Sequence, residues 1–219
     1  MELVLVRHAL PVRIDATPDG RPANPGLADL GREQAARVLH ALEHDDVAAV
    51  YSSPAARALE TAQPLVDALG LEVEVAPGIA EFDEQETSYV PVEELRAAND
   101  PRWHALVSGD LQHATIDPVA FRNRVVAAVE GVVARHPGER VVLFTHSGVL
   151  NAYCGHVLGQ PRALWFAPAY ASVSRIGAAR DGRRGVISLN ETTHVRDLLP
   201  RPDLRPDRAG APRPGAAWD

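Results

Sequence analysis

Residues 3–8 have the sequence LVLVRH, an apolar run that is followed at once by arginine and histidine. Four consecutive apolar residues, two of them valines, favour a short buried β-strand. Residues 141–146 have the sequence VVLFTH and repeat this pattern, with a histidine just beyond the apolar run. Four other runs also favour strands, the last two at an edge of the sheet, and they lie at 47–51, 72–76, about 170–176 and about 185–189.

Helical patterns separate these runs. Three of the predicted helices have a start signal, in which a capping side chain comes first and proline often follows it: Ser53-Pro54, Asp117-Pro118 and Ser147. The apolar spacing predicts helices over about 27–42, 54–69, 118–133 and 148–158. Strands that alternate with amphipathic helices predict an α/β fold, here a three-layer α/β/α sandwich with a mostly parallel central sheet flanked by helices.

Three segments fall outside this regular pattern. Residues 9–26 form a long polar loop, and 77–116 is irregular, with short helical pieces near 91–98 and 101–107. Long loops inside a compact domain are often functional. Residues 200–219 are rich in proline, arginine, glycine and aspartate, so we expect a disordered tail behind a single domain at 1–199.

The composition excludes several classes of protein. The chain has 219 residues and a net charge of −7, and all 22 basic residues are arginine. Without lysine it has neither a Walker A loop nor a pyridoxal Schiff base. An acidic chain is also a poor candidate for nucleic-acid binding. The single Cys154 excludes an intrachain disulfide and any multi-cysteine metal site.

The apolar runs also bear on location. None approaches the roughly 18 residues of a membrane helix, so we expect no membrane partner. The amino terminus lacks the basic region, the long apolar region and the cleavage site of a signal peptide. We therefore expect a cytoplasmic protein.

Polar residues follow four of the predicted strands. In a parallel α/β sheet, ligands bind beyond the carboxyl ends of the strands. Arg7 and His8 follow the first run, Arg57 lies shortly after the second, Glu81 follows the third, and His146 follows the run at 141–144. If these strands are parallel, the five side chains gather at one edge of the sheet.

Arg57 lies in the first turn of its predicted helix, where the helix dipole disfavours a cation. Two explanations are open. Arg57 could form an i,i+3 pair with Glu60. Alternatively, it holds an anion near the amino terminus of the helix.

Two guanidinium groups and two imidazoles around one point would repel each other when the site is empty. A tetrahedral dianion resolves that conflict, because arginine binds phosphate through forked, charge-assisted hydrogen bonds. Since the chain has no lysine and no evident metal site, the residues point to metal-free phosphoryl chemistry with histidine as the nucleophile.

Five segments together carry a resemblance to a known family. They are LVRHA at 5–9, GREQA at 31–35, SSPAARALETA at 52–62, THSGV at 145–149 and SLNETTH at 188–194. In this order and spacing, the chain resembles the histidine phosphatase superfamily, also called the phosphoglycerate-mutase-like family. The resemblance spans residues 3 to about 195 and implies a catalytic domain at 1–199.

The resemblance implies a role for each matching residue. His8 would be the nucleophile that becomes phosphohistidine, and Arg7, Arg57, His8 and His146 would form the phosphate pocket. Glu81 would be the general acid that protonates the leaving oxygen and later activates water. No metal or other cofactor is implied, and the partner would be a small phosphorylated substrate. The sequence also leaves open a homodimer.

The chain departs from the family pattern after the acid. The usual Gly-Trp-Glu-Gly segment is absent, and Asp83 and Glu84 therefore compete with Glu81 for the role of proton donor. The segment also lacks the sequence typical of cofactor-dependent mutases, which favours a phosphatase. Two alternatives stay open: a phosphoglycerate-mutase-type phosphotransferase, and a phosphoanion-binding protein with little turnover.

Other residues admit simpler interpretations. His40 and His44 lie one turn apart on a helix, but without a third ligand we expect a solvated face. Cys154 lacks the arginine six residues later that a tyrosine phosphatase needs, which indicates a buried, inert thiol. Four arginines of the long loops are either ligands of a second anionic group or surface residues: Arg13, Arg21, Arg96 and Arg102.

Overall fold

The structure is a computed structural model and describes residues 1–108 and 117–200, with the side chains of 105–108 left out. Apart from Pro200, the tail predicted at 200–219 lies outside the described residues. Among the described residues, no helix is both long enough and apolar enough to cross a membrane.

A six-stranded sheet forms the centre of the described part, with the order β3-β2-β4-β1-β5-β6. Its strands are β1 (Glu2–Arg7), β2 (Ala49–Ser52), β3 (Val73–Val75), β4 (Arg140–Thr145), β5 (Val173–Ala178) and β6 (Arg184–Glu191). The four strands from β3 to β1 are mutually parallel, and β5 runs antiparallel to both β1 and β6. All six predicted strands are therefore present, and the prediction of a mostly parallel sheet is confirmed.

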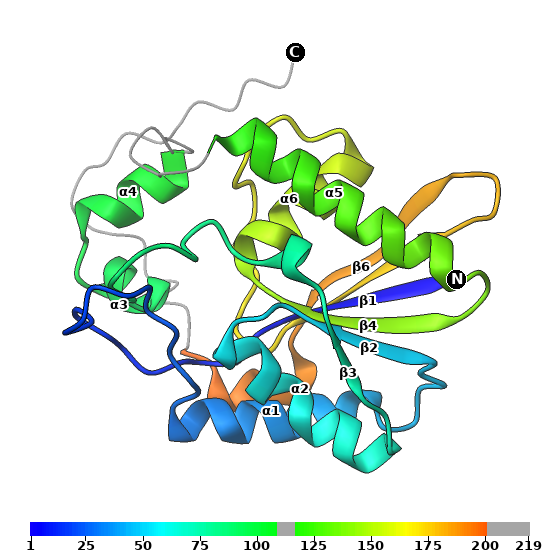
Figure 1. Cartoon of the computed structure of the whole chain (residues 1–219), viewed down its shortest axis with the longest axis horizontal. Helices are drawn as coiled ribbons and strands as arrows, with labels where there is room; N and C mark the ends of the chain where they lie inside the picture. Colours follow the sequence, from blue (N-terminus) through cyan, green and yellow to red (C-terminus); the bar gives the residue numbers. More distant parts are fainter. Residues whose placement is uncertain (109–116, 201–219) are drawn as a thin grey trace.

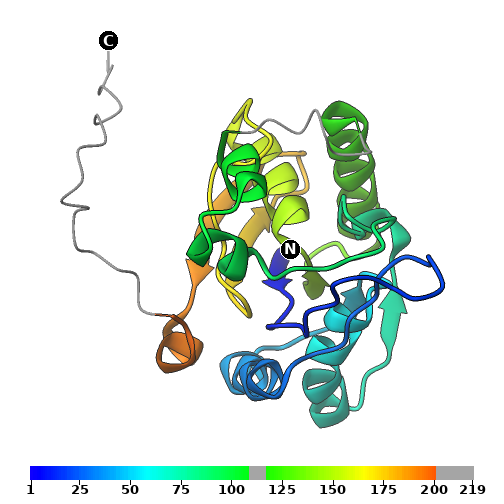
Figure 2. The ribbon, with the colours of Figure 1, turned by 90° about the vertical axis from the view of Figure 1, so that its left-hand side faces the viewer.

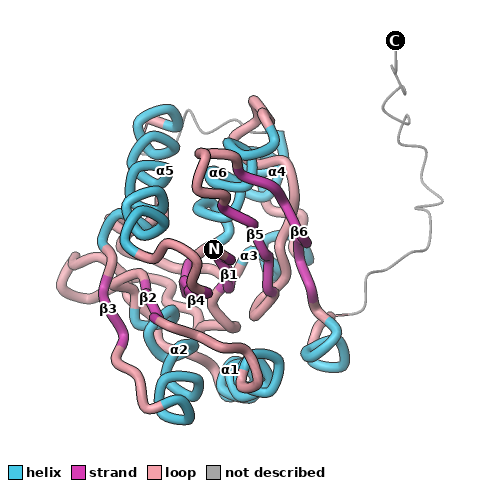
Figure 3. Tube along the Cα trace, turned by 90° about the vertical axis from the view of Figure 1, so that its right-hand side faces the viewer, coloured by secondary structure: helices cyan, strands magenta, loops and turns pink. Residues whose placement is uncertain are grey.

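Helices cover both faces of the sheet (Figure 1). On one face lie α1 (Asp29–Leu42), α2 (Ala56–Leu69) and the 3-10 helix η2 (Thr193–Leu198). On the other lie α5 (Pro118–Arg135) and α6 (Ser147–Leu158), and Figure 3 shows the same three layers from the end of the sheet. The shorter elements η1 (Pro77–Ile79), α3 (Val92–Ala97) and α4 (Pro101–Ser108) follow β3.

Strand β1 shows why the sheet needs both layers. Successive side chains of a strand point to opposite faces. Leu3 and Leu5 accordingly join the core beneath α5 and α6, whereas Val4 and Val6 join the core beneath α1 and α2. All four are fully buried. Burial on both faces explains why the run is continuously apolar instead of alternating.

Three helix starts differ from the predicted ones by one or two residues, and the first is α1, which begins at Asp29 instead of about residue 27. Helix α2 begins at Ala56 instead of Pro54, and the N–H of Ala56 donates to Oδ1 of Asn24, outside the helix, at 2.8 Å. Helix α6 begins one residue early, at Ser147. The start of α5 is as predicted, since Asp117 Oδ1 accepts the N–H of Val119 at 2.8 Å.

The two long loops meet beyond the carboxyl ends of the parallel strands (Figures 1 and 2). Ile14 and Tyr89 exchange both backbone hydrogen bonds, at 2.9 and 2.7 Å, and Ala23 N–H donates to Glu86 O at 2.7 Å. The loop at 9–26 is thereby joined to the segment after β3. Together they enclose the edge at which the sequence predicts a site.

Candidate active site

The register of the central strands brings Arg7, His8 and His146 together. Arg7 lies opposite Thr145 at the ends of β1 and β4, so the histidines that follow are neighbours. Their ring centroids are 5.1 Å apart, and the rings are tilted by 59°. His8 is 3% exposed and His146 is fully buried. This geometry allows both imidazoles to contact one bound ion.

His8 is arranged as a neutral imidazole. Its Nδ1 lies 2.8 Å from the carbonyl oxygen of Ala9, an acceptor that requires the proton on Nδ1. The other nitrogen, Nε2, therefore keeps its lone pair. Burial, followed by the charges of Arg57, His146 and Arg7, holds the pKa of His8 well below its ordinary value. A histidine nucleophile needs this neutral form at neutral pH.

Ser53 orients the second histidine. Its hydroxyl lies 2.7 Å from Nε2 of His146 and accepts the N–H of Ala55 at 3.3 Å. If the Ser53 hydroxyl donates to Nε2, neutral His146 carries its ring proton on Nδ1 and can donate it to a ligand. Burial, followed by Arg57 and Arg7, lowers the pKa of His146 well below its usual range.

Each of the two pocket arginines has a carboxylate partner. Arg7 NH1 donates to Pro168 O at 2.7 Å and to Glu93 Oε1 at 3.3 Å. Arg57 NH2 donates to Asp83 Oδ1 at 3.1 Å. Both arginine side chains are 4% exposed. The two carboxylates thus neutralise part of the positive charge that the sequence predicts at this edge.

Each guanidinium also stacks on a tyrosine. Arg7 Cζ lies 3.7 Å from the ring centroid of Tyr170, and Arg57 Cζ lies 4.7 Å from that of Tyr89. Neither tyrosine, nor Glu93, is among the residues that sequence reasoning singled out for the site. No local signal identifies them, because each is brought to its arginine from a distant part of the chain.

The i,i+3 pair suggested for Arg57 is not formed. Glu60 Oε2 instead accepts the N–H of Leu27 at 2.9 Å and holds the loop before α1. Thr61, one turn beyond Arg57, accepts the N–H of Ala9 at 3.0 Å and donates to Arg57 O at 2.6 Å. Thr61 therefore ties α2 to the residue after His8, a contact that sequence reasoning missed.

Three of the buried nitrogens in the site have no hydrogen-bond partner among the described residues. They are Nε of Arg7, Nε of Arg57 and Nδ1 of His146. Buried donors without a partner are rare and call for an explanation, because each costs free energy in an empty site. Three donors on three chain segments suit an anion with several acceptor oxygens.

Glu81 is a buried carboxyl group at the same edge. Its Oε1 accepts the N–H of Phe82 at 3.0 Å, and its Oε2 accepts the N–H of Gly148 at 2.8 Å. A side chain at position 148 would collide with this carboxyl group, so glycine is required there. Burial, and then repulsion from Asp83, raises the pKa of Glu81 to about 7. Glu81 can therefore exchange a proton near neutral pH.

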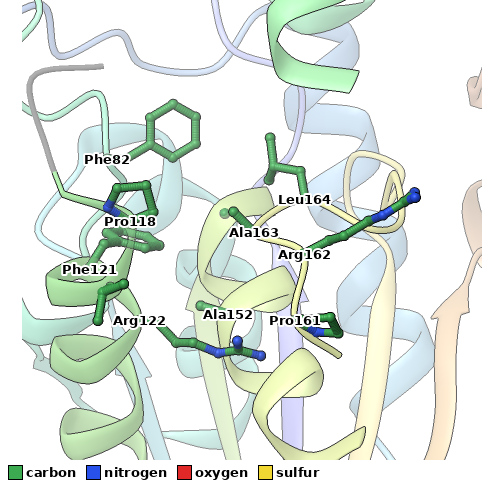
Figure 4. A pocket seen from close by; sticks show the side chains of 11 residues that line it. Phe82, Pro118, Phe121, Arg122, Ala152, Pro161, Arg162, Ala163 and Leu164 are labelled. Carbon is green, nitrogen blue, oxygen red and sulfur yellow. The ribbon is translucent and has the colours of Figure 1, made fainter. Parts of the chain in front are cut away.

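Two cavities border the segment at 80–84. One, of about 370 Å³, is lined by Ser53, Arg57 and Glu81. The other, of about 200 Å³, has mostly apolar walls, among them Phe82 and Leu164 (Figure 4). Gly148 lines it as well. Glu81 thus lines the more polar cavity, whereas Phe82 and Gly148, whose N–H groups its carboxyl group accepts, line the apolar one.

The remaining candidates from the sequence lie away from the site. His40 and His44 are exposed, as predicted, and no cluster of metal-ligating side chains occurs in the described ranges. Cys154 is fully buried, and burial raises the pKa of its thiol to about 12, which fits the predicted inert thiol.

The four loop arginines do not converge on one point. Arg13 pairs with Asp15 and Glu94, and Arg102 pairs with Asp100, all at the surface. Arg21 contacts Asp19 and also lines the polar cavity. Arg96 is exposed on α3.

Comparisons with known proteins identify the family of the chain. The histidine phosphatase superfamily (branch 1) matches residues 3–192. Phosphoserine phosphatase 1 of Hydrogenobacter thermophilus is 29% identical over 209 residues, which cover 89% of this chain and 94% of that protein.

Two solved structures share the fold. A mycobacterial glucosyl-3-phosphoglycerate phosphatase superposes with a TM-score of 0.70 at 24% identity, over 86% of this chain and 98% of that one. A mutant phosphoserine phosphatase of Entamoeba histolytica, in complex with phosphoserine, superposes with a TM-score of 0.69 at 19% identity. The superposition covers 89% of this chain and 98% of that one. Since the family match covers most of the sequence, the chain belongs to the histidine phosphatase superfamily (branch 1).

Proposed function

We propose that this protein is a metal-independent phosphatase that hydrolyses small phosphomonoesters through a phosphohistidine on His8. The observation that carries the proposal is the set of three unpartnered buried nitrogens beside a neutral histidine. The phosphatase relative and the family support hydrolysis of phosphomonoesters as the reaction class.

The first step transfers the phosphoryl group to His8. The phosphate oxygens accept hydrogen bonds from Nε of Arg7, Nε of Arg57 and Nδ1 of His146. These donors take up the charge that develops on the phosphoryl oxygens. Nε2 of His8 forms a bond to phosphorus while the ester P–O bond breaks. Glu81 gives its proton to the leaving oxygen, so the alcohol departs neutral.

The second step releases phosphate. Glu81, now ionised, takes a proton from a water molecule as the water oxygen attacks phosphorus. The P–N bond breaks and its electron pair returns to His8. The products are inorganic phosphate, a neutral His8 and a protonated Glu81, so the site is ready for the next substrate.

A mutase of the same fold differs only in the acceptor, which would be a second hydroxyl group in place of water. A phosphate-binding protein would need neither the unprotonated Nε2 of His8 nor a proton on Glu81. Isomerisation of a phosphoglycerate that outpaces hydrolysis would favour the mutase. Tight phosphate binding with no phosphoenzyme would favour the binding protein.

The substrate class follows from the leaving group. The more polar cavity beside Arg57 suits a hydrophilic leaving alcohol such as serine, which would come from phosphoserine, the compound bound to the Entamoeba histolytica protein. The apolar cavity beside Phe82 suits an aryl or alkyl alcohol. A screen of phosphoserine, phosphoglycerates and aryl phosphates against the purified protein ranks these alternatives by kcat/KM.

The central experiment removes the nucleophile. We expect His8→Ala to reduce hydrolysis of p-nitrophenyl phosphate by about 10³-fold or more. The matched control is His40→Ala, because His40 is an exposed histidine on α1 that has no part in the proposed reaction. Wild-type activity should survive EDTA, and the phosphoenzyme should be acid-labile and base-stable. Substantial activity in His8→Ala contradicts the proposal.

A further inference from the structure

We propose that Asp83 is a positioning residue for this reaction: its carboxylate holds the guanidinium of Arg57 in place and sets a negative charge beside Glu81. The inference rests on the proposed function. It also resolves which carboxyl group after β3 is the proton donor, because it gives Asp83 and Glu81 different tasks.

The first task concerns Arg57, which lies in the first turn of α2, where the helix dipole disfavours a cation. Asp83 binds one end of the guanidinium, with 3.1 Å from NH2 to Oδ1. Tyr89 lies against its face, 4.7 Å from Cζ to the ring centroid. Two supports restrict the rotation of the planar group and leave Nε, which is buried and unpartnered, for the ligand.

The second task concerns the proton of Glu81. The carboxyl group accepts N–H groups of Phe82 and Gly148, and such hydrogen bonds favour the ionised form. With these bonds alone Glu81 would be a poor acid. Burial and the nearby Asp83 carboxylate act in the opposite direction, and they outweigh the hydrogen bonds, since the pKa of Glu81 is raised.

Which of the two carboxyl groups holds the proton follows from the position of Arg57. Burial raises the pKa of Asp83 also, but the adjacent guanidinium opposes that rise through its charge and its hydrogen bond. A proton shared by the two carboxyl groups therefore favours Glu81. The charge stays on Asp83, where it faces Arg57.

Other charged groups around Glu81 do not replace Asp83. Arg57 on α2 and the amino terminus of α6 both favour ionisation of Glu81. Arg124 on α5 donates to Ala80 O at 3.1 Å, and it too is a cation. Glu84 is 40% exposed and 4.0 Å from Arg124, so solvent and that arginine screen its charge. His8 and His146 are neutral.

The test uses two substrates that differ in their need for a proton. An alkyl phosphate such as phosphoserine releases a basic alkoxide and needs the general acid. p-Nitrophenyl phosphate releases a stable phenolate and does not. The profile of kcat/KM against pH is measured with both substrates for the wild type, Asp83→Asn, Asp83→Ala, Glu81→Gln and the control Glu94→Gln. Glu94 is exposed on α3, so this control removes one negative charge without touching Arg57 or Glu81.

Asp83→Asn keeps an oxygen for Arg57 but removes the charge. With the alkyl phosphate, we expect the alkaline limb of the profile to move down by about one pH unit, because Glu81 loses its proton earlier. With p-nitrophenyl phosphate that limb should not move relative to the wild type. Asp83→Ala also releases Arg57, and its KM for both substrates should rise about tenfold. Thermal melts check that each variant folds.

Three outcomes overturn the proposal. In the first, the alkaline limb of the kcat/KM profile with the alkyl phosphate lies at the same pH for Asp83→Asn as for Glu94→Gln. Alternatively, Asp83→Asn loses alkyl-phosphate hydrolysis at every pH while Glu81→Gln retains it, which makes Asp83 the acid. A wild type that hydrolyses neither substrate and forms no phosphoenzyme refutes the proposed function, and the role of Asp83 with it.

Discussion

The two halves of the pocket are held in different ways. Arg7, His8 and His146 lie at or just beyond the ends of β1 and β4, where backbone hydrogen bonds of the sheet fix the two strands in register. Glu81, Asp83 and Glu93 lie on the irregular segment after β3. They are fixed chiefly by contacts with groups from elsewhere, such as the N–H of Gly148 and the guanidiniums of Arg57 and Arg7. In the proposed mechanism, the strand ends therefore set where the reaction occurs, and the segment sets the protonation and orientation of the reacting groups.

The largest effect is expected at a strand end. Arg7→Ala removes a buried donor of the phosphate pocket and should reduce kcat/KM by about 10²–10³-fold at every pH, since no proton is involved. Arg102→Ala is the control, because that arginine is exposed and pairs only locally with Asp100. A loss of less than tenfold in Arg7→Ala would mean that the strand ends do not form the anion site.

The effect of a substitution in the segment after β3 should depend on the leaving group of the substrate. Glu81→Gln cannot donate a proton, and we expect about 10²-fold or greater loss with an alkyl phosphate. The loss should be much smaller with p-nitrophenyl phosphate. In the wild type, kcat/KM for the alkyl phosphate should fall as pH rises through about 7, where Glu81 ionises. Equal losses with both substrates would contradict this role.

The two halves should also differ in how pH affects stability. The folded protein raises the pKa of Glu81 from 4.5 to about 7, so between these values it binds more protons than the unfolded chain. Its contribution to the free energy of unfolding is present below pH 4.5 and is lost as pH rises through 7, by at most about 3 kcal/mol. His8 and His146 have lowered pKa values, and their contribution is lost as pH falls below 6.5.

Urea unfolding of the wild type and Glu81→Gln at pH 5 and pH 8 separates these contributions. The variant should lose less stability than the wild type between the two pH values, since it lacks the group that ionises. If both proteins change equally, then Glu81 does not retain a proton in the folded state.

The smallest effect is expected for the partner of Arg7. Glu93→Gln weakens one contact, at 3.3 Å, while Pro168 O still holds the same nitrogen at 2.7 Å. We expect KM to rise about two- to fivefold, with little change in kcat or in the alkaline limb of the pH profile. A shift of that limb as large as the one expected for Asp83→Asn would show that the segment acts as a whole and not residue by residue.

Much of the architecture was accessible from local sequence. The buried strand β1 is a continuous apolar run, and the Asp117-Pro118 signature marks the start of α5 correctly. The start at Ser53-Pro54 was wrong by two residues, and the side chain that accepts the N–H of the first helical residue, Ala56, comes from Asn24, 32 positions away. Local propensity cannot register such a contact.

By itself, the sequence determined the order of strands and helices and the presence of an arginine and two histidines just beyond strand ends, since hydrophobic periodicity and turn residues act over a few positions. Only the tertiary structure decided that Asp83 faces Arg57, that Glu93 faces Arg7, and that the Glu81 carboxyl group is buried against Gly148. Charge pairing and desolvation depend on distances through space, and segments far apart in the chain set those distances.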